Sequence, residues 1–189
     1  MHFNKHYELK DKHAFLSPSK YTWLGYSKEQ LFNVYNNAMA AAKGTKLHSM
    51  AKDLIEEGIK LRGNSQTFAA YVNDAIGYGM TPEQPLYFSE HCFGTTDAIY
   101  YKNGILRIHD LKTGITPAHM EQLEIYAALF LLEYEKIFGV SPQNTKVNLR
   151  IYQNDDVIED TPDMDRLEEL MLDIREKSQW VEEFRSEVD

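Results

Sequence analysis

Residues 94–112 read GTTDAIYYKNGILRIHDLK, and this stretch decides how the middle of the chain folds. Two runs rich in β-branched and aromatic residues flank Asn103-Gly104. This dipeptide between two such runs is the strongest short-range signal for a β-hairpin with a two-residue turn. Such a turn places Lys102 opposite Ile105 and thereby sets the register of the whole hairpin.

In this register Asp97 lies opposite Asp110, and side-chain alternation puts Lys112 on the same face. The face continues through apolar residues, namely Ile99, Tyr101, Leu106 and Ile108. Two carboxylates roughly 5 Å apart repel each other by about 3 kcal/mol at an effective dielectric of ~20. A cation between them, or a proton on one of them, removes this cost, and hard oxygen ligands suit Mg²⁺ or Mn²⁺. The residues predict a metal site with a lysine beside it, although a lone D-x-K triplet is often a solvated strand edge.

The rest of the chain alternates helical and extended patterns. Helices are expected after the Ser27–Gln30 capping box, from Thr45 to Gly58, from Ser65 to Gly77, from Ala118 to Phe138 before Gly139, and after Thr161 (N-cap) and Pro162 (N1). Strands are expected at Leu86–Phe93, Thr95–Tyr101, Ile105–Lys112 and Lys146–Gln153. This order predicts an α/β fold around a small mixed sheet.

The chain has 189 residues and 22.0 kDa, the size of one domain. We expect a single domain over residues 1–189, with a helical part at 1–80, a core at 81–153 and an acidic C-terminal helix at 154–189. The net charge of -9 is uneven: residues 154–189 carry 14 acidic and 4 basic residues, and residues 1–153 carry 15 and 16. The acidity therefore belongs to the last segment and does not exclude a nucleic-acid partner.

One cysteine, Cys92, cannot build a disulfide framework or a four-cysteine iron–sulfur or zinc site within the chain. The N-terminus lacks the apolar run of a signal peptide, and no segment is long enough to span a bilayer. These features favour a protein of the cytoplasm (the host cytoplasm for a phage protein) with no membrane partner.

Four motifs, in the same order, resemble those of the RecB-like branch of the PD-(D/E)XK nuclease superfamily. They are the G-x-x-x-H motif at Gly44–His48, G-x-x-D at Gly94–Asp97, the D-x-K strand at Asp110–Lys112 with its Thr113-Gly114 exit, and Q-x-x-x-Y at Gln122–Tyr126. Leu16–Ser19 is also similar to the opening of such domains. The resemblance implies a restriction-endonuclease-like core with a small central mixed sheet flanked by helices.

It also implies roles for individual residues. His48, Asp97, Asp110 and the backbone carbonyl of Leu111 would hold Mg²⁺ or Mn²⁺, Lys112 would be the catalytic lysine, and Gln122 and Tyr126 would position the lysine or DNA. Glu90 is a further carboxylate that could lie near the ion. Taken alone, His48 reads as a hydrogen-bonded boundary residue more readily than as a ligand, and Tyr126 as core.

DNA contacts are expected from hydroxyl, basic and imidazole side chains, namely Ser17, Ser19, Lys43, Lys46, Lys52 and His119. Lysines on an exposed helix face are nevertheless ordinary. Many RecB-like relatives carry four cysteines for an iron–sulfur cluster, which this chain lacks, so no such cluster is expected. The size resembles that of stand-alone nucleases that bacteriophages encode.

The expected function is a divalent-metal-dependent exonuclease that hydrolyses phosphodiester bonds at DNA ends, in recombination, repair or DNA processing. Two alternatives stay open: an endonuclease or nickase with the same core, and a DNA-end-binding or recombination-accessory protein with little catalysis. A recombination protein or a second copy of the chain are the expected protein partners. The acidic terminal helix could instead bind a partner or mimic DNA, although its apolar stripe favours docking on its own domain or on a sister subunit.

Overall fold

The computed structural model describes residues 5, 7, 10, 13–62 and 67–188, and the side chains of 186–188 are outside that description. The chain divides into two compact units, residues 1–43 and 44–189. Helix α1 (Lys28–Glu56) contributes to both. None of the helices in the described part of the chain is long and apolar enough to cross a membrane.

The smaller unit contains a 3-10 helix at Pro18–Gly25 and the first part of α1. The expected capping box is present: the N–H of Gln30 donates to Ser27 Oγ at 3.2 Å, and the N–H of Ser27 donates to Gln30 Oε1 at 2.8 Å. These bonds satisfy amides at the helix start that have no partner within the helix. The capping residues therefore define where α1 begins.

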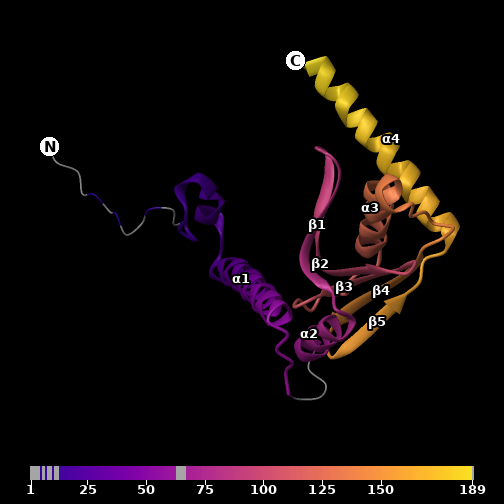
Figure 1. Ribbon diagram of the computed structural model, residues 1–189. Helices are drawn as coiled ribbons and strands as arrows, with labels where there is room; N and C mark the ends of the chain where they lie inside the picture. The colour runs from indigo at the N-terminus through magenta and orange to yellow at the C-terminus, as the bar shows by residue number, and fades with distance from the viewer. Residues whose placement is uncertain (1–4, 6, 8–9, 11–12, 63–66, 189) are drawn as a thin grey trace. The chain divides into compact units, whose positions relative to one another are not determined.

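The larger unit is built on a five-stranded mixed sheet in the order β1-β2-β3-β4-β5. Its strands are β1 (Thr81–Ser89), β2 (Cys92–Lys102), β3 (Ile105–Leu111), β4 (Lys146–Gln153) and β5 (Asp156–Asp160). β3 and β4 are parallel, and the other pairs are antiparallel. The mixed sheet with helices on its faces confirms the α/β fold class and is consistent with a restriction-endonuclease-like core (Figure 1).

Two hydrophobic clusters cover the two faces of this sheet. Ile99, Leu106 and Ile108 pack with α3 (Glu121–Phe138) and α4 (Met164–Val188). Ala98 and Leu111 pack with the end of α1 and with α2 (Thr67–Tyr78). Side chains of successive strand residues point to opposite faces, and the strand pattern therefore places both clusters.

The β2–β3 hairpin has the expected register over five pairs, from Lys102–Ile105 to Ala98–His109. Gly139, with φ of 64°, ends α3 as expected, because a left-handed residue closes the helix at little cost for glycine. Local turn chemistry thus predicts both features.

Three expectations about element boundaries are wrong, and one strand was not expected. α1 runs through Gly44 as one helix, because the cost of about 1 kcal/mol for a helical glycine is outweighed by packing. The strand expected at Leu86–Phe93 instead contains the turn between β1 and β2. The short exposed β5 was not expected. Asp163 caps α4 through the N–H of Arg166 at 2.8 Å, in place of Thr161 and Pro162.

Candidate metal centre

Asp97 lies one residue beyond the last pair of the hairpin ladder, and its carboxylate joins two elements. Its Oδ2 accepts a hydrogen bond from the backbone N–H of Leu111 at 2.8 Å. Its Oδ1 lies 3.2 Å from Nδ1 of His48 on α1. Asp97 is therefore held between α1 and the end of β3, the strand of the D-x-K motif with Asp110 and Lys112.

His48 reaches this position because α1 approaches the exit of β3 closely. A Cβ atom at Gly44 would lie 2.8 Å from Thr113 Oγ1, inside normal contact distance. Gly44 is buried one helical turn before His48, so the two residues share a face of α1. The two ends of the G-x-x-x-H motif therefore have different roles. Gly44 lets α1 approach Thr113 closely, and His48 directs its side chain at Asp97.

A third potential ligand, Glu83, comes from β1. One ligand atom each from His48, Glu83 and Asp97 can be chosen so that all lie within 4.8 Å of one another. Glu83 falls opposite Asp97 in the β1–β2 register, between the pairs Pro82–Ala98 and Gln84–Thr96. Sequence reasoning missed Glu83 because the turn between β1 and β2 has no Asn-Gly signal, and without that turn the register is open.

Glu90 lies in that turn and pairs with Arg185 of α4 at 3.2 Å instead of joining the cluster. Glu90 is seven positions after Glu83, which is roughly 23 Å along an extended strand. The structure therefore does not bring Glu90 to the cluster, and Glu83 is the carboxylate of this hairpin that lies there.

The D-x-K strand connects the cluster to α3. Lys112 Nζ lies 3.0 Å from both carboxylate oxygens of Asp110 and donates a hydrogen bond to Oδ1. It also donates to Gln122 Oε1 at 2.8 Å, and Gln122 Nε2 in turn donates to Tyr126 Oη at 3.4 Å. Gln122 and Tyr126 share one helical face, as the i,i+4 spacing predicts. The ammonium group is therefore held in place from two sides.

Gly94, the first residue of G-x-x-D, faces this network. A Cβ atom at Gly94 would lie 2.8 Å from Cε1 and 3.3 Å from Oη of Tyr126. Glycine is therefore required for β2 to pack against this part of α3, and the phenol of Tyr126 is positioned by the strand that carries Asp97.

Asp110 is the most buried charged group of the cluster, with its side chain 6% exposed. Burial raises the pKa of its carboxyl, the nearby Asp97 raises it further, and Lys112 opposes the rise. Its Oδ2 is buried and accepts no hydrogen bond from the residues that the structure describes, although Lys112 lies at ion-pair distance. Lys112 compensates part of the cost of burying this carboxylate, and a bound cation would stabilise it further.

The pKa values of His48 and Glu83 are also raised by the negative charge of this cluster. The hydrogen bond to Asp97 raises the pKa of His48 against the opposing effect of burial. Burial and Asp97 raise the pKa of Glu83, whereas His48 and Lys52 lower it. Imidazole nitrogen and carboxylate oxygen are both ligands of Mn²⁺, and carboxylates suit Mg²⁺. The donor set of His48, Glu83 and Asp97 thus fits a divalent cation.

The remaining predicted residues lie outside this cluster. Lys46 is exposed on α1, Lys52 pairs with Glu56 at 3.9 Å, and His119 is exposed in the segment before α3. Ser17, Ser19 and Lys43 belong to the smaller unit, where Ser17 Oγ and Ser19 Oγ are 2.9 Å apart. Their proposed contacts with DNA, and that of the Leu111 carbonyl with a metal ion, stay predictions.

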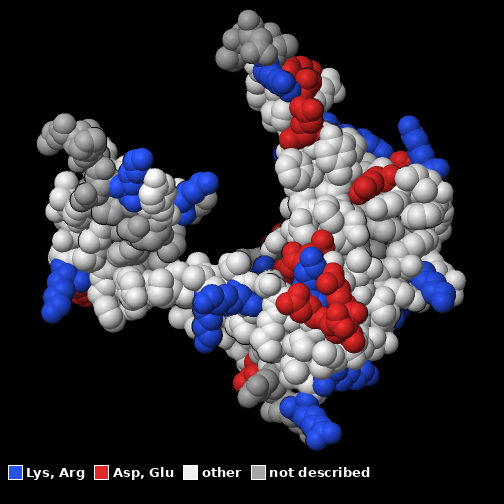
Figure 2. All heavy atoms as spheres, turned by 60° about the vertical axis from the view of Figure 1, so that its left-hand side comes forward, with Lys and Arg blue, Asp and Glu red and all other residues white. Residues whose placement is uncertain are grey.

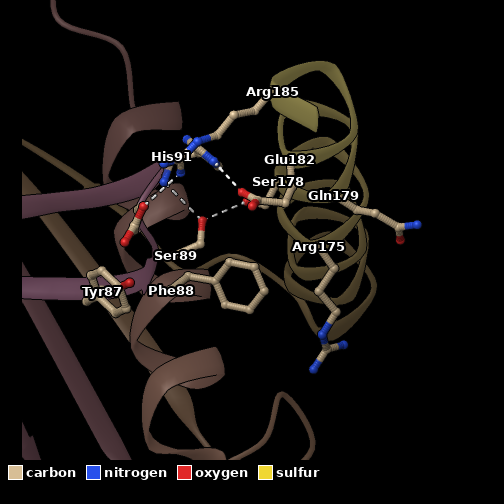
Figure 3. A pocket seen from close by; sticks show the side chains of 10 residues that line it. Tyr87, Phe88, Ser89, His91, Arg175, Ser178, Gln179, Glu182 and Arg185 are labelled. Carbon is tan, nitrogen blue, oxygen red and sulfur yellow. Dashed lines mark hydrogen bonds and ion pairs between the residues drawn. The ribbon is translucent and has the colours of Figure 1, made fainter. Parts of the chain in front are cut away.

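A hollow lies between the β1–β2 turn and α4 (Figure 3). His91 Nε2 is 2.8 Å from Glu182 Oε2 there, and Ser89 Oγ is 3.3 Å from Ser178 Oγ. Together with the Glu90–Arg185 pair, these contacts give polar groups of the turn partners on α4. These contacts hold the β1–β2 hairpin against α4. The paired groups offer no chemistry comparable to that of the candidate metal centre.

The cluster and the sheet define an α/β protein with a candidate divalent-metal centre. Comparison with protein families adds that residues 80–188 match a family described as a protein of unknown function, DUF2800. Because the match covers more than half of the chain, the protein belongs to the DUF2800 family. It includes Glu83, Asp97, Asp110 and Lys112, whereas His48 lies before it. No curated protein matches the chain significantly.

Proposed function

We propose that this protein is a divalent-metal-dependent nuclease that hydrolyses phosphodiester bonds in DNA, with exonuclease activity at DNA ends. The observation that carries the proposal is the meeting of His48 and Asp97 with the Asp110–Lys112 pair around the end of β3. A nitrogen ligand, two carboxylates and an ammonium group in one place match the requirements of phosphodiester hydrolysis. Their motif order, which resembles RecB-like nucleases, supports the same proposal.

Each residue has a role that follows from its contacts. His48, Asp97 and Asp110 would hold the ion, and the Leu111 carbonyl would be a further ligand. An ion bound there would supply Lewis-acid polarisation of the phosphate and a lowered pKa for bound water. Lys112, held by Asp110 and Gln122, would place its positive charge where negative charge develops on the phosphate. Tyr126 would position Gln122 through their hydrogen bond.

The distribution of charge is compatible with a DNA substrate. Acidic side chains gather toward the C-terminal end of α4 (Figures 1 and 2). Basic residues in the part of α1 near His48 include Lys46 and Lys52. Phosphate contacts from such lysines would make substrate affinity fall steeply with salt.

Digestion of linear and covalently closed circular double-stranded DNA tests the proposal, with Mg²⁺, with Mn²⁺ and with chelator. Wild type, Lys112→Ala and the control Lys102→Ala are compared, because Lys102 is exposed on the same hairpin. We expect metal-dependent loss of linear DNA alone, absent in Lys112→Ala and unchanged in Lys102→Ala. Cutting of the circle would make the enzyme an endonuclease. DNA binding with no cleavage of double-stranded DNA, single-stranded DNA or RNA would overturn the proposal in favour of an accessory role.

A further inference from the structure

Glu83 has an unusual backbone for a residue inside a strand. Its φ is +49°, a left-handed value that side chains other than Asn, Asp and Gly rarely adopt. The other non-glycine residues with positive φ in the described part of the chain are Asn103, Asn154 and Asp155, and all three lie in turns. Such strain inside an element persists where the surroundings maintain it, and it is concentrated at functional sites.

The side chain of Glu83 has no structural partner that would explain this conformation. Its carboxylate accepts no hydrogen bond from the residues that the structure describes, and Asp97 lies opposite it in the strand register. The neighbouring cationic side chain, Lys52, forms its own pair with Glu56. The fold therefore maintains a strained residue whose side chain faces the Asp97 carboxylate and the His48 imidazole.

We propose that Glu83 is a ligand of the divalent cation together with His48 and Asp97, and that its left-handed backbone directs the carboxylate to the ion. Ligands on opposite sides of an ion with bonds of about 2.1 Å are roughly 4.2 Å apart. The ligand atoms of these three residues lie within 4.8 Å of one another, so small side-chain movements bring them onto one ion. The buried Asp110 carboxylate, with its side chain 6% exposed, adds negative charge beside Asp97, and Lys112 at 3.0 Å offsets the charge of only one of these carboxylates.

The ligand set also indicates which ion binds. Imidazole nitrogen binds first-row transition ions more readily than Mg²⁺, while carboxylate oxygens accept Mn²⁺ and Mg²⁺. A site with His48, Glu83 and Asp97 therefore prefers Mn²⁺ to Mg²⁺. The inference rests on the metal-dependent function proposed above, because it assigns a further ligand to the same ion, but it is tested by binding alone.

The experiment measures Mn²⁺ affinity of the full chain at pH 7.5, by titration calorimetry or by the EPR signal of free Mn²⁺. Glu83→Gln keeps the shape of the side chain, and Glu90→Gln is the matched control on the same hairpin, because Glu90 pairs with Arg185 instead. We expect Glu83→Gln to raise the Kd for Mn²⁺ by roughly tenfold or more, as removal of groups around metal sites does. Glu90→Gln should leave the Kd within twofold of wild type.

A second variant, Glu83→Gly, separates metal binding from folding. Glycine adopts a positive φ without strain, so the metal-free variant should melt at the wild-type temperature or about 2 °C above it. Added Mn²⁺ should stabilise it much less than wild type. A Kd for Glu83→Gln within twofold of wild type overturns the role of Glu83, as does a wild type that binds no Mn²⁺. Tight, Glu83-dependent Mn²⁺ binding without DNA cleavage would support this inference and contradict the nuclease proposal alone.

Discussion

The backbone N–H of Leu111 donates a hydrogen bond to Asp97 Oδ2 at 2.8 Å, so a carboxylate of the candidate metal centre also maintains the end of β3. The same bond fixes the distance between Asp97 and the strand that carries Asp110 and Lys112. The structural role of Asp97 and its proposed role as a metal ligand can be separated by substitution.

Asp97→Asn should abolish tight Mn²⁺ binding without weakening the metal-free fold. The amide oxygen can still accept the Leu111 N–H bond, and the repulsion of Glu83 and Asp110 is removed. The pKa of His48, which Asp97 raises, should fall in this variant. Mn²⁺ titration, urea unfolding and NMR titration of the imidazole check the three effects.

Asp97→Ala is the matching control, because it removes the acceptor as well as the ligand. Leaving the N–H of Leu111 unsatisfied should cost about 1–3 kcal/mol of unfolding free energy in the metal-free protein. Equal stability of the Asn and Ala variants would show that the hydrogen bond does not maintain the end of β3.

Lys112→Met should destabilise the metal-free protein by about 2–3 kcal/mol at pH 7, since it leaves the buried Asp110 carboxylate without its cation. Burial already raises the folded-state pKa of Asp110, and removal of Lys112 raises it further. A raised folded-state pKa favours the fold at low pH, so the deficit relative to wild type should shrink as the pH falls from 7 toward 5.

Urea unfolding of wild type, Lys112→Met and the exposed control Lys102→Met across this pH range provides the measurement. Saturating Mn²⁺ should also reduce the deficit, because the ion replaces the lost positive charge. A deficit that is constant with pH and with metal would mean that Lys112 stabilises the fold through packing instead of through Asp110.

Gly94→Ala should reduce both stability and activity, because the new methyl group meets Tyr126 Cε1 at 2.8 Å. Overpacking of this kind costs about 1–3 kcal/mol, and it should displace the phenol that bonds Gln122. The double variant Gly94→Ala/Tyr126→Ala removes the clash and should recover stability without recovering cleavage. Thermal unfolding and the DNA assay report the two quantities; activity restored with stability would exclude a positioning role for Tyr126.

His109 should make the protein less stable in mild acid. It is 1% exposed, its Nδ1 lies 3.2 Å from Tyr152 Oη, and burial, Arg150 and Arg107 lower its pKa to about 3. Between an unfolded pKa of about 6.5 and the folded value, only the unfolded state takes up the proton, so stability falls as the pH falls. The loss should be on the order of 2 kcal/mol between pH 7 and 4.5.

His109→Gln provides the comparison, because it keeps polar groups at this position without a titrating ring. Denaturant unfolding of the chelator-treated protein should show that the variant is less stable at pH 7 but loses less stability on acidification. Parallel curves for the two proteins between pH 7 and 4.5 would show that His109 does not contribute to the acid sensitivity.

Local rules account for the parts of the site that lie close together in sequence. Asn103-Gly104 predicts the β2–β3 register, and the spacing of Gln122 and Tyr126 predicts their shared helical face. The D-x-K spacing brings Asp110 and Lys112 together in the same way. These relationships depend on strand and helix periodicity, which is a property of the chain itself.

Contacts between distant segments were decided by the tertiary structure. His48 and Asp97 are 49 positions apart, and α1 must run unbroken through Gly44 to bring them together. Glu83 enters the cluster only through the β1–β2 register, for which no turn residue provides a signal. The sequence by itself determined the hairpin, the fold class and the residues of the D-x-K strand, because their geometry is local. Only the tertiary structure showed that Glu83, and not Glu90, lies beside Asp97, because packing of whole elements decides which side chains meet across the sheet.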